Sequence, residues 1–176
     1  RLHAVKIRMN PNLTELPSDI GYNDTMRILS MDQNNIQVIP DDLGRLTNLE
    51  TLSLDENNIS VLSSALCSLP RLEELSISDN QVPQLCDNLA SLQRLRMLNI
   101  NSNPIQALPK SIGSLQKLEY INLWDVPLQT EPTQLYDLPN LQVLCLNPAD
   151  HYPSPRIIRN IRKNLKSRVD FLTTDG

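Results

Sequence analysis

The chain has 176 residues, of which 40% are apolar and 3% are aromatic, and this length corresponds to about one domain whose core is filled by Leu, Ile and Val. Four glycines and thirteen prolines exclude collagen-like and flexible-linker sequences. The net charge is −4, and residues 1–149 carry 17 acidic and 10 basic side chains, a balance that disfavours nucleic acid and anionic lipid as partners.

Self-similarity with a period of 23 residues dominates the chain. Residues 2–25 form a partial unit with one inserted residue, residues 26–140 form five complete units, and residues 141–176 hold the last repeat and a C-terminal cap. The units begin at Met26, Leu49, Leu72, Leu95 and Leu118, and a further copy begins at Leu141. Such a fixed period predicts a repeat architecture in which each unit buries its apolar face against its neighbours.

Each unit combines a strand pattern with a turn pattern. The fourth and sixth positions are apolar and therefore face the same side of a short strand. The ninth position holds Asn34, Asn57, Asn80 and Asn103 in four consecutive units. An Asn amide can donate and accept at once, so we expect this column to satisfy buried backbone groups of neighbouring turns. The sequence therefore predicts one strand per repeat, stacked in parallel.

A helix is predicted after the last repeat. Ser154 can cap its N-terminus, and Pro155 suits its first turn. Ile157, Ile158, Ile161 and Leu165 form one apolar stripe that should cover the open end of the core. Six basic residues lie between positions 156 and 168. They indicate either a solvated helix face or contact with an acidic partner, a phosphoinositide or nucleic acid.

The unit L-x-x-L-x-L-x-x-N-x-I-x-x-L-P-x-x-[IL]-G-x-L-x-x, clearest in residues 26–48 and 95–117, resembles the leucine-rich repeat. The resemblance implies an α/β fold. This is a right-handed solenoid with a concave parallel β-sheet, a convex side of 3-10 helix, helix or irregular segments, and a C-terminal capping helix. The chain departs from the pattern where Val126 and Ala149 replace the Asn, and where Ser63 and Cys86 replace the Pro. These departures predict remodelled turns.

The 23-residue form resembles the intracellular class of these repeats, which includes Ras-binding scaffolds, ubiquitin ligases and bacterial effectors. The resemblance implies a module that binds a partner protein on its concave face, within a larger signalling, ligase or effector protein. It implies no enzyme and no cofactor; the alternative is a purely structural or oligomerisation solenoid. We expect a monomer without a membrane span, located inside the cell or delivered into a host cytoplasm.

The few chemically reactive side chains do not suggest catalysis. Cys67, Cys86 and Cys145 are odd in number and not closely spaced, which favours a reducing compartment. His151 follows Cys145 by six residues, but a catalytic pair would need contact and an orienting third group. No Cys/His cluster has the spacing of a metal site, so we predict no metal.

An acidic strip is predicted on the concave face. The third, fifth and seventh positions of each unit point away from the core, and the eighth follows at the strand exit. The strip consists of Asp32, Asp55, Glu56, Glu74 and Asp79. Like charges on strands about 4.8 Å apart repel by roughly 0.8 kcal/mol, so stability offers no evident reason for them. We expect a partner with a basic patch; the alternative is that the acids only keep this face soluble.

Three large side chains form a predicted apolar island beside that strip. Trp124 is the only tryptophan and stands in a column that is otherwise polar or charged. Tyr120 precedes it on the same strand face, and Met97 lies on the neighbouring strand. Trp and Tyr often dominate binding energy at protein interfaces. Trp124 is therefore expected to be at least partly exposed and to anchor the partner, unless the loss of Asn at Val126 lets it turn inward.

Overall fold

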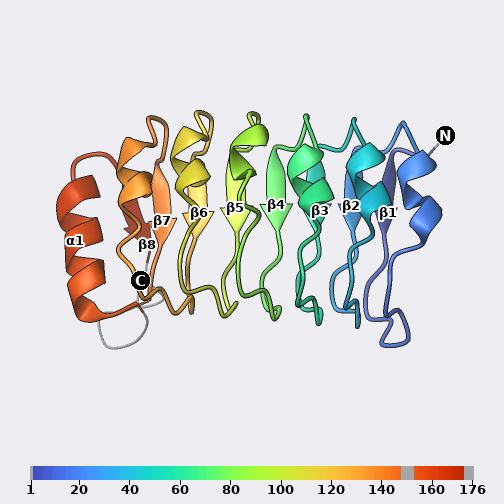
Figure 1. Cartoon of the computed structure of the whole chain (residues 1–176), viewed down its shortest axis with the longest axis horizontal. Coiled ribbons are helices and arrows are strands. Elements are labelled where there is room, and N and C mark those ends of the chain that lie inside the picture. The colour runs from blue at the N-terminus through green and yellow to red at the C-terminus, as the bar shows by residue number, and fades with distance from the viewer. Residues whose placement is uncertain (1, 148–152, 173–176) are drawn as a thin grey trace.

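Eight parallel strands form one open sheet in the computed structural model, which describes residues 2–147 and 153–172 (Figure 1). Each strand has three residues and pairs with its neighbours in chain order. They are β1 (Ala4–Lys6), β2 (Ile28–Ser30), β3 (Thr51–Ser53), β4 (Glu74–Ser76), β5 (Met97–Asn99), β6 (Tyr120–Asn122), β7 (Val143–Cys145) and β8 (Asp170–Leu172). The expected solenoid is confirmed.

Strand register follows the 23-residue period. Leu52 pairs with Leu75 and then Leu98, so the fourth position forms one continuous inward-facing column. Ala4 pairs with Ile28, and this separation of 24 residues reflects the one inserted residue of the first unit. Because the period fixes the register, side chains that share a position in the repeat stand next to one another across the sheet.

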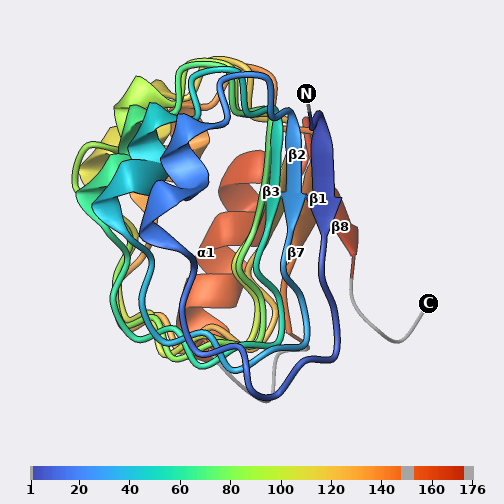
Figure 2. The ribbon, with the colours of Figure 1, turned by 90° about the vertical axis from the view of Figure 1, so that its right-hand side faces the viewer.

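Short 3-10 helices line the side opposite the sheet (Figure 2). They are η1 (Ser18–Tyr22), η2 (Asp41–Arg45), η3 (Ser64–Ser68), η4 (Leu89–Ser91), η5 (Lys110–Ser114) and η6 (Thr133–Asp137). Proline precedes η1, η2, η5 and η6, and its fixed φ suits the extended backbone found before the first three of these turns. Where Cys86 replaces this proline, η4 is shorter and starts later, so the predicted remodelling of this turn is confirmed. Where Ser63 replaces it, η3 keeps the usual length and start, so the prediction was wrong for that turn.

Glycine recurs on this side because successive turns approach closely. A Cβ atom on Gly113 would lie 2.9 Å from the carbonyl oxygen of Gln134 in the next turn. At Gly44 the neighbours are the Cβ and carbonyl oxygen of Ala65, both at 3.1 Å. Any larger side chain at these positions would push neighbouring repeats apart.

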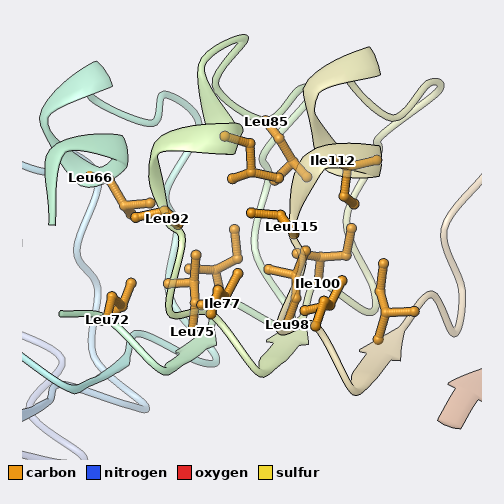
Figure 3. Packing of buried hydrophobic residues seen from close by; sticks show 14 of the residues in the cluster. Leu66, Leu72, Leu75, Ile77, Leu85, Leu92, Leu98, Ile100, Ile112 and Leu115 are labelled. Atoms are coloured by element: carbon orange, nitrogen blue, oxygen red, sulfur yellow. The ribbon is translucent and has the colours of Figure 1, made fainter. Parts of the chain in front are cut away.

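Between the sheet and the turns lies a continuous aliphatic core (Figure 3). Leu75 and Ile77 point into it from one repeat, and Leu98 and Ile100 from the next, and all four are fully buried. Leu92 and Leu115 reach the same space from the opposite side. Each buried Leu or Ile contributes about 1.5–3 kcal/mol by leaving water.

The asparagine ladder (Asn34, Asn57, Asn80 and Asn103) bonds as predicted. The Asn80 side-chain amide donates to the carbonyl oxygens of Leu54, Ile77 and Ser78, and its oxygen accepts from the Ile59 N–H. Asn57 and Asn103 repeat this pattern one unit away on either side. One side chain per repeat therefore satisfies backbone groups of two consecutive repeats.

Cys67 and Cys86 form a disulfide, which their spacing in the sequence did not predict. Cys67 occupies the glycine position of its unit and Cys86 the proline position of the next, so both lie in the segments that return from the sheet. The bond joins the two neighbouring repeats that lack proline, next to a pocket of about 400 Å³. Disulfides persist in oxidising compartments, so the cysteines do not support a reducing one.

Helix α1 (Pro155–Leu165) closes the C-terminal end of the core, as the sequence predicts. Ile157, Ile158, Ile161 and Leu165 are buried, and Pro155 lies in the first turn. Ser154 precedes the helix, but its side chain makes no capping hydrogen bond, so that part of the prediction was wrong. The chain then continues into β8, a strand that the sequence analysis did not predict.

Candidate functional site

The outward-facing side of the sheet, here called the sheet face, presents the predicted strip and island. Its most regular feature is the backbone at the eighth position of each unit, directly after the strand. Every residue there from the first to the sixth copy has a positive φ between 51° and 59°, although none is glycine. These residues are Met9, Gln33, Glu56, Asp79, Ser102 and Asp125. This conformation is costly for side chains with a Cβ and is common at functional positions.

Asp32, the first member of the predicted strip, is not an open surface charge. Its side chain is buried, and the residue is 6% exposed. Its carboxylate accepts from the hydroxyls of Ser30 (2.8 Å) and Ser53 (2.5 Å), from the Asp55 N–H (3.1 Å) and from Arg8 (2.9 Å). Burial works against the charged form, but these hydrogen bonds and the Arg8 charge outweigh it and lower the pKa of Asp32.

Asp55 has the same role one repeat further along. Its carboxylate accepts from the Ser76 hydroxyl at 2.6 Å and from the Ser78 N–H at 2.7 Å. Ser76 and Ser78 are both buried, so Asp55 satisfies polar groups that water does not reach. The expectation that stability gives no reason for acids in this column was therefore wrong for Asp32 and Asp55.

A second polar ladder therefore crosses the sheet face, parallel to the asparagine ladder. Beyond Asp55 the ladder continues with Asn99, which donates a hydrogen bond to the Ser76 hydroxyl (3.0 Å). Asn122 then donates to Asn101 (3.4 Å). We call the chain of residues Asp32, Ser53, Asp55, Ser76, Asn99, Asn101 and Asn122 the face ladder. Its repeating signal is an Asp or Asn at the seventh position and a Ser or Asn at the fifth position of the next unit, interrupted at Ser78, and it is visible in the sequence once the register is known.

The remaining acids of the strip are open to solvent. Glu56, Glu74 and Asp79 are all exposed. Glu56 accepts a hydrogen bond from Gln33 at 3.0 Å, and Glu74 accepts a long one from Thr51 at 3.4 Å. Asp125, which the predicted strip omits, is also exposed and stands in the same column as Glu56 and Asp79. The open acidic surface thus extends along the strand exits toward Trp124.

The apolar island lies on β5, β6 and the exit of β6. Met97 is the direct pairing partner of Tyr120, and both side chains are half-buried. The Tyr120 hydroxyl lies 3.3 Å from the Cys145 sulfur; burial, followed by this contact, raises the pKa of Tyr120 to about 12. Tyr120 is therefore neutral at physiological pH and presents an uncharged ring to solvent.

Trp124 is half-buried on the sheet face, which agrees with the prediction of partial exposure. Its backbone N–H donates to the Asn122 side chain at 3.0 Å. Val126 itself fills the space of the missing ladder asparagine and is fully buried. Trp124 keeps part of its surface exposed, so it is not buried in place of the missing asparagine.

Other chemistry finds little support in the described part of the chain. Cys145 is buried, and His151, its considered partner, lies outside the described residues. Within residues 2–147 and 153–172, no group of His, Cys, Asp and Glu is arranged to hold a metal ion. In the same residues no helix has the length and apolar character needed to cross a membrane.

Comparison with known proteins finds similarity to leucine-rich-repeat proteins. A family model described as a leucine-rich repeat region matches residues 16–104. The structure of an LRR protein of Leptospira interrogans shares 28% identity over 97% of this chain and 49% of its own, with a TM-score of 0.72. An internalin of Listeria monocytogenes shares 24% identity over 99% of this chain and 48% of its own, with a TM-score of 0.79. No curated protein matches. The chain thus spans about half the length of either solved structure.

Proposed function

The chain belongs to the leucine-rich-repeat family, and we propose on that basis that it recognises a partner protein through its sheet face. The observation that carries the proposal is the position of Trp124, a half-buried aromatic side chain in a polar column, beside Tyr120 and Met97. Large aromatic side chains that are already partly shielded lose little entropy on binding and often dominate interface energies. Nothing in this arrangement calls for a catalytic step.

The face ladder makes this surface a rigid platform. Hydrogen bonds fix Asp32, Asp55, Asn99 and Asn122 between strands, so the side chains around them are held in place before a partner arrives. A preorganised surface binds more tightly because less order has to be created on association. We therefore assign Asp32 and Asp55 to the platform rather than to direct contact.

The exposed acids supply charge complementarity. Glu56 and Asp79 lie at strand exits and Glu74 lies at the start of β4; all three are exposed on the sheet face, and they suit a partner with a basic patch. Such a patch would accelerate association and fix the orientation of the partner more than it would raise affinity. We propose a monomer that serves as the partner-binding part of a larger signalling, ubiquitin-ligase or effector protein.

The redox state of Cys67 and Cys86 indicates the compartment in which the protein is located. An intracellular protein, or one acting in a host cytoplasm, would keep this pair reduced, whereas the disulfide is the form expected in an oxidising compartment. Alkylation of the protein in intact cells, followed by mass measurement of the peptides that carry Cys67 and Cys86, distinguishes the two. Alkylated cysteines support the intracellular location, and a linked pair contradicts it.

The Trp124→Ala variant tests the proposed binding face. It should keep the fold and weaken partner binding by about 2 kcal/mol, roughly thirtyfold in Kd. Quantitative mass spectrometry of proteins captured by the wild type and the variant identifies the partner, and calorimetry then gives both Kd values. Tyr22→Ala is the matched control, because Tyr22 is an exposed aromatic on η1, on the opposite side of the molecule.

Two results would count against Trp124 as an anchor. One is loss of the folded state in the Trp124→Ala variant, seen by circular dichroism. The other is tryptophan fluorescence that is blue-shifted and insensitive to acrylamide in the free wild-type protein. Equal loss of binding in the Tyr22→Ala variant would move the interface away from the sheet face.

A further inference from the structure

A second surface with the features of a binding site lies at the C-terminal end of the solenoid, away from the sheet face. A groove of about 670 Å³ is lined by Arg159, Arg162, Lys163, Lys166 and Phe171. Arg159, Arg162 and Lys163 lie on α1, and Lys166 directly follows it. The four occupy positions i, i+3, i+4 and i+7 and so share one face of the helix. Figure 1 shows α1 at the end of the array, next to β8.

The charges in this groove are uncompensated within the described structure. Arg159, Arg162, Lys163 and Lys166 are exposed, and none forms an ion pair with a carboxylate in residues 2–147 or 153–172. By contrast, Arg27 pairs with Glu50 and Arg96 with Glu119 in the body of the solenoid. Four neighbouring cations repel one another, so an anionic ligand would offset an electrostatic repulsion that is present in the folded protein.

The basic residue next to the groove has a structural role instead. Arg168 donates to the carbonyl oxygens of Tyr136 (2.8 Å) and Leu138 (3.5 Å) and so fastens the end of the cap to η6. Asn160 on α1 donates to Glu131, which also accepts from the Tyr136 hydroxyl. These bonds hold the inner side of α1 and leave its basic side free to face a ligand.

The groove also borders an open strand edge. β8 is the last strand of the sheet, and its Asp170 N–H and Leu172 C=O bond to the β7 side, with the Gln142 carbonyl and the Leu146 N–H. Backbone groups alternate in direction along a strand, so the N–H and C=O of Phe171 point to the edge that lacks a neighbour. A ligand in the groove therefore meets cations on one side and unpaired backbone groups on the other.

We propose that this groove binds an extended acidic segment of a partner protein, which pairs with β8 as an additional strand and sets its carboxylates against α1. Strand addition satisfies the Phe171 backbone groups, and alternate side chains of the added strand repeat every 6–7 Å or so. That repeat is close to the roughly 5–6 Å separation of neighbouring basic positions on the helix. Half-buried Phe171 offers an apolar contact to the segment between its carboxylates.

Charge and shape favour a short acidic peptide over a nucleic acid or a membrane. The remainder of the chain is acidic, so a long polyanion or a charged lipid surface would be repelled beyond the groove. A short segment places its charge only where the cations are. Its backbone also matches the strand edge, which neither phosphodiesters nor lipid headgroups can do.

The test measures fluorescence anisotropy of a labelled peptide in which Glu alternates with Val, added to the whole chain. Saturable binding is expected, and the double variant Arg162→Glu, Lys163→Glu should weaken it at least about tenfold. Lys110→Glu, Lys117→Glu is the matched control, because both lysines are exposed and lie outside the groove. Equal weakening by both double variants would overturn the proposal, since it would reflect net charge alone.

Backbone methylation of the peptide separates strand addition from simple charge attraction. N-methyl groups on one alternating set of residues should abolish binding, whereas the same groups on the other set should not, because only one set faces β8. Equal binding of the two methylated peptides would overturn strand addition. The unlabelled parent peptide should compete with the probe at low concentration. Competition of equal strength by oligothymidylate, or by vesicles of equal parts phosphatidylcholine and phosphatidylserine, would overturn the assignment to a peptide.

The groove and the sheet face are independent in this proposal. Trp124→Ala should leave binding of the acidic peptide unchanged, and the Arg162→Glu, Lys163→Glu variant should leave binding at the sheet face unchanged. Loss of peptide binding in the Trp124→Ala variant would contradict a separate site at the cap.

Discussion

Asp55 and Glu56 are neighbours in the chain, on the same face and with the same charge, yet the structure uses them in opposite ways. Asp55 turns between the strands and accepts hydrogen bonds from Ser76 and Ser78 of the next repeat. Glu56 stands one residue later, where φ is 54° and the side chain is exposed at the strand exit. The residues at the seventh position of the repeat thus form a structural column. Those at the eighth position form a presenting column, whose side chains are available to a partner.

This difference separates the acids needed for folding from those available to a partner. An Asp side chain next to a serine of the following strand accepts hydrogen bonds from that strand. Its own carboxylate and the donors of the strand both gain partners, and the Asp is therefore part of the platform. A residue with positive φ gains no such bond to the sheet and adds backbone strain, so its side chain needs another reason to be there. Four substitution experiments, taken from the largest expected effect to the smallest, test the distinction.

Asn80→Ala should be the most damaging change, because Asn80 lies beneath both columns and its side chain joins four backbone groups. Buried carbonyls and the Ile59 N–H would lose their partners, at a cost of about 3 kcal/mol in the free energy of unfolding. Urea denaturation measures it, with Asn58→Ala as the control at an exposed position. A similar midpoint for both variants would contradict the asparagine ladder.

Asp55→Ala should cost about 1–2 kcal/mol, because the buried Ser78 N–H and Ser76 hydroxyl lose their acceptor. Glu56→Ala should change stability by less than about 0.5 kcal/mol, as expected for an exposed side chain. The two variants differ by one position and remove the same charge. Equal unfolding free energies for both would show that the two columns do not differ in role.

Low pH should lower the stability of the folded protein because Asp32 becomes protonated. Its pKa is lowered in the folded state, so the stability it contributes is fully present above its unfolded pKa near 3.9 and is lost as the pH falls through the folded value. We expect Asp32→Asn to have a lower Tm than the wild type at pH 5, with the difference shrinking toward pH 2. A Tm difference that stays constant over this range would mean that the charge of Asp32 has no stabilising role.

Glu56→Gly should raise stability slightly, by about 0.5 kcal/mol, because glycine adopts the positive φ at this position without strain. The same substitution at Asn58, where φ is not positive, should lower it. Denaturation curves of the two variants provide the comparison. A loss of stability in Glu56→Gly would mean that the carboxylate contributes to the fold, and it would remove Glu56 from the presenting column.

Sequence periodicity alone fixed much of the molecule. The spacing of Leu and Ile defined the strands and their register, and the recurrence of Asn predicted the ladder that Asn57, Asn80 and Asn103 form. The stripe from Ile157 to Leu165 predicted the cap. These features follow from patterns within one repeat, because each depends on which side of a strand or helix a residue occupies.

Other features required the tertiary structure, because they join different positions of different repeats. The bonds of Asp32 and Asp55 to serines of the next strand, and the pairing of Cys67 with Cys86, depend on backbones that are close only after stacking. The period-2 pattern shows that a side chain faces outward, but not whether a neighbour covers it. The additional strand β8 lies outside the 23-residue spacing, since Val143 pairs with Asp170, so only the folded end of the solenoid reveals that edge and the basic groove beside it.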